Sequence, residues 1–282
     1  MAVSDEERGG STVHYLGSPV TPQFVPVVTG RLTDGRPLQR SEAGARGAAV
    51  TLTGVRSGGR DRRPAADGIS VRIPAGQSVA LYDHADSSAV ELLDVIGGLR
   101  RPRSGQVSVD GVAVHLLRGA SLERYRAQRG LLSGRFPLLS SPSVIDNVQA
   151  ALRMRRPTTA AKNRAAELLM MVGVAHLAAR RVDTLSAEQQ WRVLVTRALL
   201  AAPRLMLAED PAPGLDSRAA RRVLDLLMDA QAQLGFTLLL ATSRLATTAR
   251  CDRVLSLSDG GLIADELTSD DAWTRGRIDR IG

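Results

Sequence analysis

The hydrophobic pattern of this chain alternates between short apolar runs and longer amphipathic stretches. The short runs are typical of strands buried on one or both faces. They cover residues 48–53, 69–73, 79–82, 205–208, 236–240, 254–257 and 261–263. The longer stretches repeat apolar residues at helical spacing and cover residues 90–99, 143–180, 182–203 and 218–234. Strands that alternate with amphipathic helices predict an α/β fold, in which helices cover both faces of a mostly parallel sheet.

Departures from this alternation set the expected domain boundaries. Asp110-Gly111 lies between two apolar runs and predicts a tight hairpin turn. The first 47 residues are rich in Gly, Pro, Ser, Thr and Arg, which favours a disordered extension. Polar residues from Asp265 onward predict a short helix in the tail. The expected parts are an extension (1–47), a folded domain (48–266) with a helical subdomain (about 140–185), and a tail (267–282).

Composition narrows the functional classes. The chain has no run of about 18 apolar residues, so no membrane-spanning helix is predicted. The single cysteine, Cys251, excludes an internal disulfide and is typical of a reducing cytosol. The formal net charge is +8, but the arginines are scattered and aromatic residues make up only 3%, which does not favour nucleic-acid binding. Lys162 is the only lysine, so a lysine-dependent phosphate site could draw on that residue alone.

The stretch over residues 76–99 predicts a strand, a polar turn and a helix. This is the frame of a phosphate-binding loop, because the exposed N–H groups of a helix N-terminus favour an anion. The strand, turn and helix are predicted, but the residues of the turn are not those that a phosphate-binding loop requires.

Several separated stretches carry a resemblance to a known family. They are IPAGQSVAL, LLDVIGGLRRPRSGQVSVDG, FPLLSSPSVIDNV and LSAEQQWRVLVTRALLAAPRLMLAEDPAPGLDSR. In order and spacing they resemble the nucleotide-binding subunit of ATP-binding cassette (ABC) transporters, of the lipoprotein-release and macrolide-export type. The resemblance covers roughly residues 48–265.

This resemblance implies a P-loop NTPase-like fold with a mostly parallel sheet, an antiparallel β subdomain and a helical subdomain. It also implies ATP and Mg²⁺ as ligands in the family. The implied partners are a membrane permease or a second ABC ATPase subunit, in a dimer. The implied location is the cytoplasm, at the inner face of the membrane through the permease.

The phosphate loop departs from the family's G-x-x-x-x-G-K-[ST] pattern at every chemically important position. Asp83 and Ser88 stand where its two glycines are expected, and Asp86 stands where the family usually has a further glycine. Ala89 replaces the lysine that reaches the phosphates. Val90 replaces the hydroxyl that holds Mg²⁺.

The same loop has gained acidic residues. Asp83 and Asp86 lie in or beside the phosphate cradle, and Glu91 is expected in the first helical turn. Ser88 and Glu91 have the spacing of a capping box, in which side chains satisfy the helix start. We therefore expect the chain's own carboxylates to occupy the anion site and to repel a triphosphate.

The family's Walker B strand ends in Asp-Glu, where the acids hold the Mg²⁺ shell and polarise water. This chain has the reverse order, Glu209-Asp210. Both acids could retain some metal affinity, although a base shortened by one methylene is displaced by about 1 Å, which can reduce the rate on the order of 100-fold. Alternatively, capping or arginine pairing satisfies both acids, and no metal is bound.

The remaining motif positions are also altered. The signature motif L-S-G-G-Q appears as Leu185 followed by Ser186, Ala187, Glu188 and Gln189, so that an anion replaces a glycine that approaches a phosphate.

Ser243 takes the place of the switch histidine, and Gly134 is nearest to the glutamine of the glutamine loop. No aromatic residue lies within residues 50–80 to stack on adenine. Asp216 retains the acid of the D-loop.

Three functions follow from these observations. The first is a catalytically degenerate subunit that serves as a scaffold or regulator of a permease or a competent ATPase subunit, with no cofactor expected. The second is a weak or partner-dependent ATPase half of an asymmetric transporter, for which Ser186 and Gln189 would be retained. The third is an arginine-rich protein that binds nucleic acid or a regulatory partner.

Overall fold

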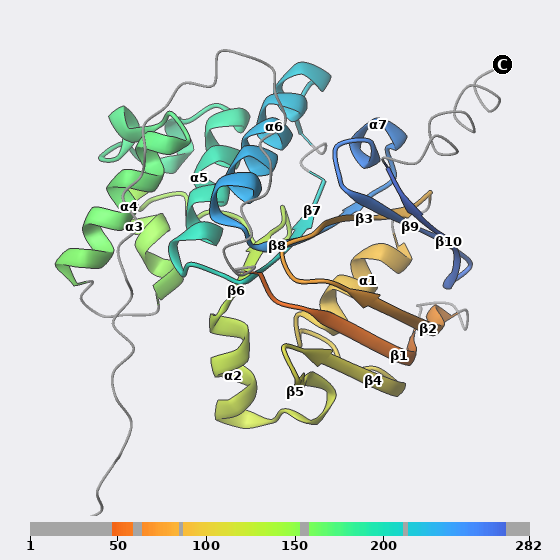
Figure 1. The fold of residues 1–282 in the computed structure, drawn as a ribbon. Coiled ribbons are helices and arrows are strands. Elements are labelled where there is room, and N and C mark those ends of the chain that lie inside the picture. The colour runs from red at the N-terminus through yellow and green to blue at the C-terminus, as the bar shows by residue number, and fades with distance from the viewer. Residues whose placement is uncertain (1–46, 59–63, 85–86, 153–157, 211–213, 269–282) are drawn as a thin grey trace, which may run out of the picture. The chain divides into compact units, whose positions relative to one another are not determined.

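A six-stranded sheet lies at the centre of the folded chain (Figure 1). The computed structural model describes residues 47–58, 64–84, 87–152, 158–210 and 214–268. The strand order is β10-β9-β3-β8-β7-β6, and all pairs are parallel except β9 with β10. The strands are β3 (Ser78–Asp83), β6 (Arg129–Leu132), β7 (Leu205–Glu209), β8 (Thr237–Thr242), β9 (Arg253–Ser258) and β10 (Gly261–Leu267). The predicted α/β fold with a mostly parallel sheet is confirmed.

The inner strands of this sheet divide their side chains between two hydrophobic cores. In β7, Leu205 and Leu207 belong to one core, whereas Met206 and Ala208 belong to the other. Successive side chains of a strand point to opposite faces, so a strand covered on both faces is apolar throughout. This explains why β3, β7 and β8 appear in the sequence as unbroken apolar runs.

A second, antiparallel sheet has the order β2-β1-β4-β5. Its strands are β1 (Val50–Gly58), β2 (Pro64–Ile73), β4 (Ser104–Val109) and β5 (Val112–Ala113). Asp110 and Gly111 both have positive φ, at 49° and 77°, which confirms the predicted tight turn. Gly105 in β4 has a φ of 87°, and a Cβ there would lie 2.3 Å from the carbonyl oxygen of Gly54. Only glycine fits this crossing of the two strands.

Helices cover both faces of the central sheet. They are α1 (Ser87–Ile96), α2 (Gly119–Ala127), α3 (Val144–Gln149), α4 (Thr159–Met171), α5 (Ala187–Leu200), α6 (Ser217–Leu234) and α7 (Leu245–Thr248). Helix α1 contacts strands of both sheets, and α3, α4 and α5 pack on one another beside α6 (Figure 1). In the part of the chain that the structure describes, no helix is both long and apolar enough to cross a membrane.

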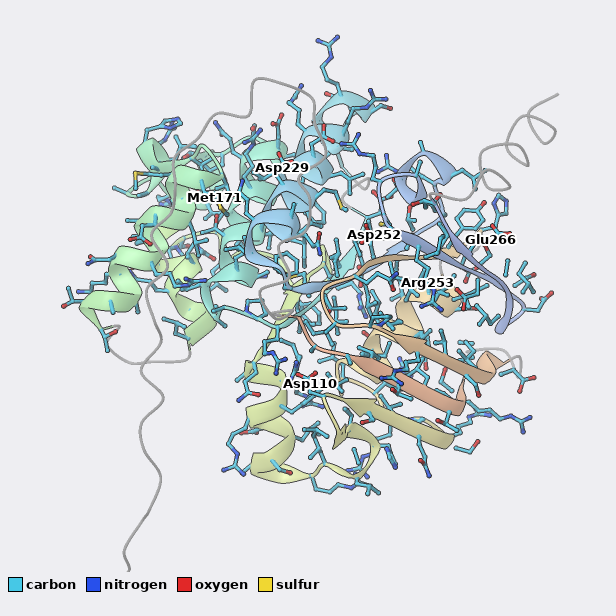
Figure 2. The ribbon with its side chains drawn as sticks, viewed as in Figure 1. Asp110, Met171, Asp229, Asp252, Arg253 and Glu266 are labelled. Carbon is cyan, nitrogen blue, oxygen red and sulfur yellow. The ribbon has the colours of Figure 1, made fainter. Side chains whose placement is uncertain are left out.

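Side-chain contacts fasten the start of β9 to its neighbours. The Asp252 carboxylate accepts hydrogen bonds from the backbone N–H and the hydroxyl of Ser78 in β3, at 2.8 and 2.7 Å. Asp252 and Arg253 are labelled in Figure 2, and Arg253 pairs with Asp265 of β10 at 2.5 Å. Asp265 lies within β10 (Gly261–Leu267), so the predicted tail helix does not begin there, and residues 269–282 lie outside the described residues.

Other boundaries differ from the predicted ones. Strands β1 and β2 are longer than predicted. The prediction missed their outer halves because these carry polar residues. Helix α2 and strand β6 were not predicted. Residues 1–46 lie outside the described residues, so the disordered extension and the other domain boundaries stay predictions. Gly47 itself is buried, and its carbonyl accepts a hydrogen bond from Arg204 at 2.7 Å.

Candidate functional site

The turn between β3 and α1 is satisfied by a carboxylate of the chain. Asp83 ends β3 and is only 4% exposed. Its Oδ2 accepts the backbone N–H of Ser88, the second residue of α1, at 2.7 Å. An N-terminal amide of a helix is the kind of group that would otherwise bind a phosphate oxygen. One such amide is here taken by an internal anion.

The compared phosphate-loop positions that lie in α1 are buried or half-buried. Ser88 and Ala89 are 5% and 0% exposed, and Ala89 packs in the core beneath α1. Val90 is half-buried, and Asp86 lies outside the described residues.

The predicted capping box of Ser88 and Glu91 is wrong, because Ser88 lies inside α1 and Glu91 lies beyond its first turn. Glu91 instead pairs with Arg100 at 3.0 Å. Burial raises the pKa of the Glu91 carboxyl above its ordinary value.

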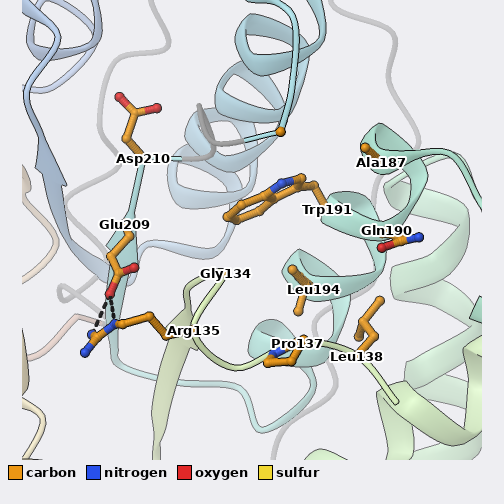
Figure 3. Close-up of a pocket in the computed structure, with 11 residues that line it drawn as sticks. Gly134, Arg135, Pro137, Leu138, Ala187, Gln190, Trp191, Leu194, Glu209 and Asp210 are labelled. Atoms are coloured by element: carbon orange, nitrogen blue, oxygen red, sulfur yellow. Dashed lines mark hydrogen bonds and ion pairs between the residues drawn. The ribbon is translucent and has the colours of Figure 1, made fainter. Parts of the chain in front are cut away.

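The acid at the end of β7 is held by an arginine. Ser133 donates its hydroxyl to Oε2 of Glu209 at 2.6 Å, and Nε of Arg135 donates to Oε1 at 2.6 Å (Figure 3). The same guanidinium donates to both oxygens of Asp94 in α1, at 2.8 and 3.0 Å. Hydrogen bonds to Asp94 and Glu209 raise the pKa of Arg135, so this guanidinium stays charged. Arg135 therefore neutralises two carboxylates from two elements.

The next acid, Asp210, is held by a second arginine. Arg244 donates to Asp210 through Nε at 2.9 Å and also through Nη2. The hydroxyls of Thr242 and Thr247 donate to Oδ2 at 2.5 and 2.9 Å. The Asp210 side chain is 10% exposed. Ser243, which is predicted to take the place of the switch histidine, is half-buried.

These contacts distinguish the two interpretations of the Glu209-Asp210 pair. Each acid has an arginine partner and at least one hydroxyl donor from the same chain. Among the described residues, no group of three or more His, Cys, Asp or Glu side chains is arranged to hold a metal ion. The arrangement favours arginine pairing over a metal site.

The residues that are compared with the signature motif in the sequence lie at the start of α5. Ser186 caps this helix: its hydroxyl accepts the N–H of Gln189 at 3.3 Å, and the Gln189 side chain accepts the N–H of Ser186 at 2.9 Å. Glu188 pairs with Arg192 and Arg222. The hydrogen bond from Arg222 lowers the pKa of Glu188 to about 2. Burial acts in the opposite direction, and Arg192 lowers the pKa further. The helix start is thus satisfied internally.

A cavity of about 520 Å³ lies between α5 and the loop after β6 (Figure 3). Ala187 and Trp191 line one side, and Gly134 lines the other. The acids Glu209 and Asp210 also reach it. Arg135 is the one cationic side chain among its described lining residues, and its guanidinium is already bound by carboxylates. The cavity therefore offers little attraction to a phosphate group.

Asp216 begins α6 as its N-cap and accepts the N–H groups of Arg218 and Ala219 at 2.9 and 2.8 Å. Replacing Asp216 with alanine is expected to lower the free energy of unfolding by about 1 kcal/mol, because two amides of the first turn lose their acceptor. Urea unfolding measures the change. Asp229→Ala, an exposed change within α6 (Figure 2), is the matched control and should have less than half of that effect. Equal losses in the two variants would exclude a capping role.

Arg135 and Arg244 were not identified from the sequence as the partners of Glu209 and Asp210. Arg135 follows β6 and Arg244 follows β8, whereas the acids end β7, which lies between these strands. The carboxyl ends of parallel strands meet at one edge of a sheet. An arginine two or three positions after the end of a neighbouring strand could therefore have been predicted to pair with these acids.

Comparisons with known proteins agree with this fold. A family model described as ABC transporter matches residues 66–213. The lipoprotein-releasing system ATP-binding protein LolD of Anaeromyxobacter dehalogenans is 35% identical over 228 residues, which cover 77% of this chain and 93% of LolD. The methionine import ATP-binding protein MetN of Caulobacter vibrioides is 35% identical over 205 residues. That match covers 72% of this chain but only 61% of MetN, so the chain spans about three-fifths of that relative.

Solved structures show the same fold. A dimeric bacterial ABC transporter cassette superposes with a TM-score of 0.69 at 24% identity, covering 78% of this chain and 99% of that one. The cbiO1 protein of Clostridium perfringens, part of the ABC transporter complex cbiONQ, superposes with a TM-score of 0.72 at 23% identity, covering 82% and 93%. At these identities the likeness concerns the fold alone.

Proposed function

Because the chain belongs to the ABC transporter family of ATP-binding proteins, we propose that it is a transporter subunit in which ATP hydrolysis has been lost. The observation that carries this proposal is the pairing of both acids that end the β7 strand. Arg135 binds Glu209, and Arg244 binds Asp210. A carboxylate bound in this way is a poor general base, because its lone pairs already accept hydrogen bonds.

The position of the acids supports the loss of hydrolysis. Asp210 stands where the family has the longer glutamate, and a base displaced by about 1 Å can lose on the order of 100-fold in rate. Its hydrogen bonds to Thr242 and Thr247 hold it toward the chain itself. A competent site would require Asp210 to release these partners and to reach a water molecule.

The phosphate loop supports the loss of tight nucleotide binding. The Asp83 carboxylate accepts the backbone N–H of Ser88 in α1. Ala89 supplies no positive charge where the family has lysine. A phosphate that approached this amide would meet a carboxylate within a few ångströms, where like charges repel. We therefore expect neither ATP nor Mg²⁺ as a resident ligand.

The proposed role is that of a scaffold or regulatory subunit. The relatives LolD and MetN are named as ATP-binding proteins of a lipoprotein-releasing system and of methionine import. By analogy, this chain would bind a membrane permease or pair with a competent ATPase subunit at the cytoplasmic face of a membrane. The retained fold then supplies a surface rather than chemistry.

A titration with a fluorescent ATP analogue and Mg²⁺ tests the proposal. We expect a dissociation constant above about 1 mM, which corresponds to a binding free energy weaker than about 4 kcal/mol. LolD of Anaeromyxobacter dehalogenans, measured beside it, serves as the comparison protein. Micromolar affinity, or phosphate release above that of a blank, would contradict the proposal.

A second arm of the experiment tests the role as a subunit. Co-expression with a candidate membrane permease or a second ABC ATPase subunit, followed by purification through a tag on that partner, should recover a stoichiometric complex. Recovery of the tagged partner without this chain, together with binding of the chain to DNA that is lost at moderate salt, would instead favour the arginine-rich binding protein.

A further inference from the structure

Three charged side chains connect α5 to α6. Glu188 and Arg192 lie one turn apart in α5, and Arg222 lies in α6. Arg192 donates to Oε1 of Glu188 through Nε at 3.2 Å and through Nη2 at 2.9 Å. Arg222 donates through Nε to both oxygens of the same carboxylate, at 3.0 and 3.1 Å, and through Nη2 at 2.5 Å. We call these three residues the Glu188 cluster.

The cluster also reaches α4. Nη1 of Arg192 donates to the carbonyl oxygen of Val172, the C-cap residue of α4, at 2.7 Å. The carbonyl groups at a helix C-terminus lack partners within the helix and favour a cation. One guanidinium therefore links the end of α4 to the start of α5, and the carboxylate links both to α6.

The cluster differs from an ordinary surface ion pair. The side chains of Glu188 and Arg192 are 21% and 23% exposed, and that of Arg222 is 44% exposed. Isolated exposed pairs contribute little to stability, whereas branched networks with defined hydrogen-bond geometry contribute more. The lowered pKa of Glu188, about 2, reflects stabilisation of the charged carboxylate by the guanidinium groups of Arg222 and Arg192.

We propose that the Glu188 cluster is an electrostatic latch that fixes α4 and α5 on α6 in one orientation. The helices pack through apolar contacts as well, but such contacts are less directional than a carboxylate shared by two guanidinium groups. With the latch closed, the three helices move as one body. When salt or substitution opens it, the start of α5 is released from α6 while the sheet is unaffected.

The latch does not depend on the loss of ATP hydrolysis. None of its residues contacts Glu209, Asp210 or the turn before α1 among the described contacts. The latch is tested by hydrogen exchange and the proposed function by nucleotide binding, so a failure of the test below would leave the proposed function intact, and the reverse also holds.

Hydrogen exchange measured by mass spectrometry on the full chain tests the latch. The variant is Arg222→Gln, and the matched control is Arg221→Gln, its exposed neighbour in α6 that takes no part in the cluster. We expect the amides over residues 189–193 to exchange about tenfold faster in Arg222→Gln than in the control. Amides of β7 and β8 should exchange at the same rate in both variants.

Ionic strength supplies a second measurement. Raising the salt concentration from about 0.05 to about 0.5 M should accelerate exchange over residues 189–193 in the unmodified chain and in Arg221→Gln, because the charges are screened. The rate in Arg222→Gln should change less, because only the pair between Arg192 and Glu188 is left to be screened. Arg222→Lys, which keeps the charge but not the two-pronged geometry, should give an intermediate rate.

The proposal is overturned by equal exchange rates in Arg222→Gln and Arg221→Gln. It is also overturned if Arg222→Gln accelerates exchange equally in α5, β7 and β8, since that result would indicate a general loss of stability. Selective acceleration at the start of α5 supports it.

Discussion

Replacing Arg135 with methionine is expected to lower the free energy of unfolding by about 2–4 kcal/mol. Asp94 and Glu209, with side chains 10% and 19% exposed, would both lose their cation. A buried carboxylate left without a partner costs about 3–5 kcal/mol, and we take a lower range because Arg135 itself is 43% exposed, so water can reach the vacated side. Urea unfolding followed by circular dichroism gives the value.

Two further variants make this result specific. Arg181→Met makes the same change of residue type in an exposed ion pair, the one with Asp183. It should change the free energy of unfolding by less than about 1 kcal/mol. Neutralising both acids as well, in Arg135→Met with Asp94→Asn and Glu209→Gln, should restore a large part of the loss, because no charge is then left unpaired. Similar losses in Arg135→Met and Arg181→Met would show that the shared guanidinium does not hold these two acids.

Replacing Phe236 with alanine is expected to have the largest effect, a loss of about 3–5 kcal/mol. The ring is 2% exposed, in the core between α6 and the central sheet, and its removal leaves a cavity that tight packing cannot fill. The backbone carbonyl of Phe236, which accepts a hydrogen bond from Gln231, is unaffected by the change. The midpoint and slope of urea unfolding separate lost stability from altered compactness.

Phe136→Ala is the matched control for this substitution. Phe136 is 39% exposed on the loop after β6, so the same change of residue type removes far less buried surface. We expect a loss below about 1 kcal/mol. If the two alanine variants unfolded at the same urea concentration, the core assigned to Phe236 would be wrong.

The central sheet could be predicted because its inner strands are covered on both faces. In a strand such as β8, every residue is buried and the residues between its two terminal threonines are apolar, so the strand stands out in the sequence. Helix α2 was missed because only Tyr125 among its residues is buried, so its apolar repeat is weak. The outer half of β2 was missed because Asp67 and Gly68 resemble a turn, although they lie within the strand.

At the site, the acids could be predicted but their partners could not. Glu209 and Asp210 follow an apolar strand and were found by their position. Arg135 and Arg244 lie 74 and 34 residues away from them in the sequence, and only the order of strands in the sheet brings them to the same edge. The capping box was predicted at the wrong residue. Helix α1 begins at Ser87, and the backbone N–H of Ser88 donates to the Asp83 carboxylate inside the helix start.

The counter-charges of Glu209 and Asp210 are part of the same polypeptide, and this changes how concentration affects the fold. A dissociable ligand stabilises a protein by RT ln(1 + [L]/Kd), a contribution that disappears as the ligand is diluted. Arg135 and Arg244 are present once for every acid at any dilution. Charge balance at this edge of the sheet is therefore a unimolecular property, established when the chain folds.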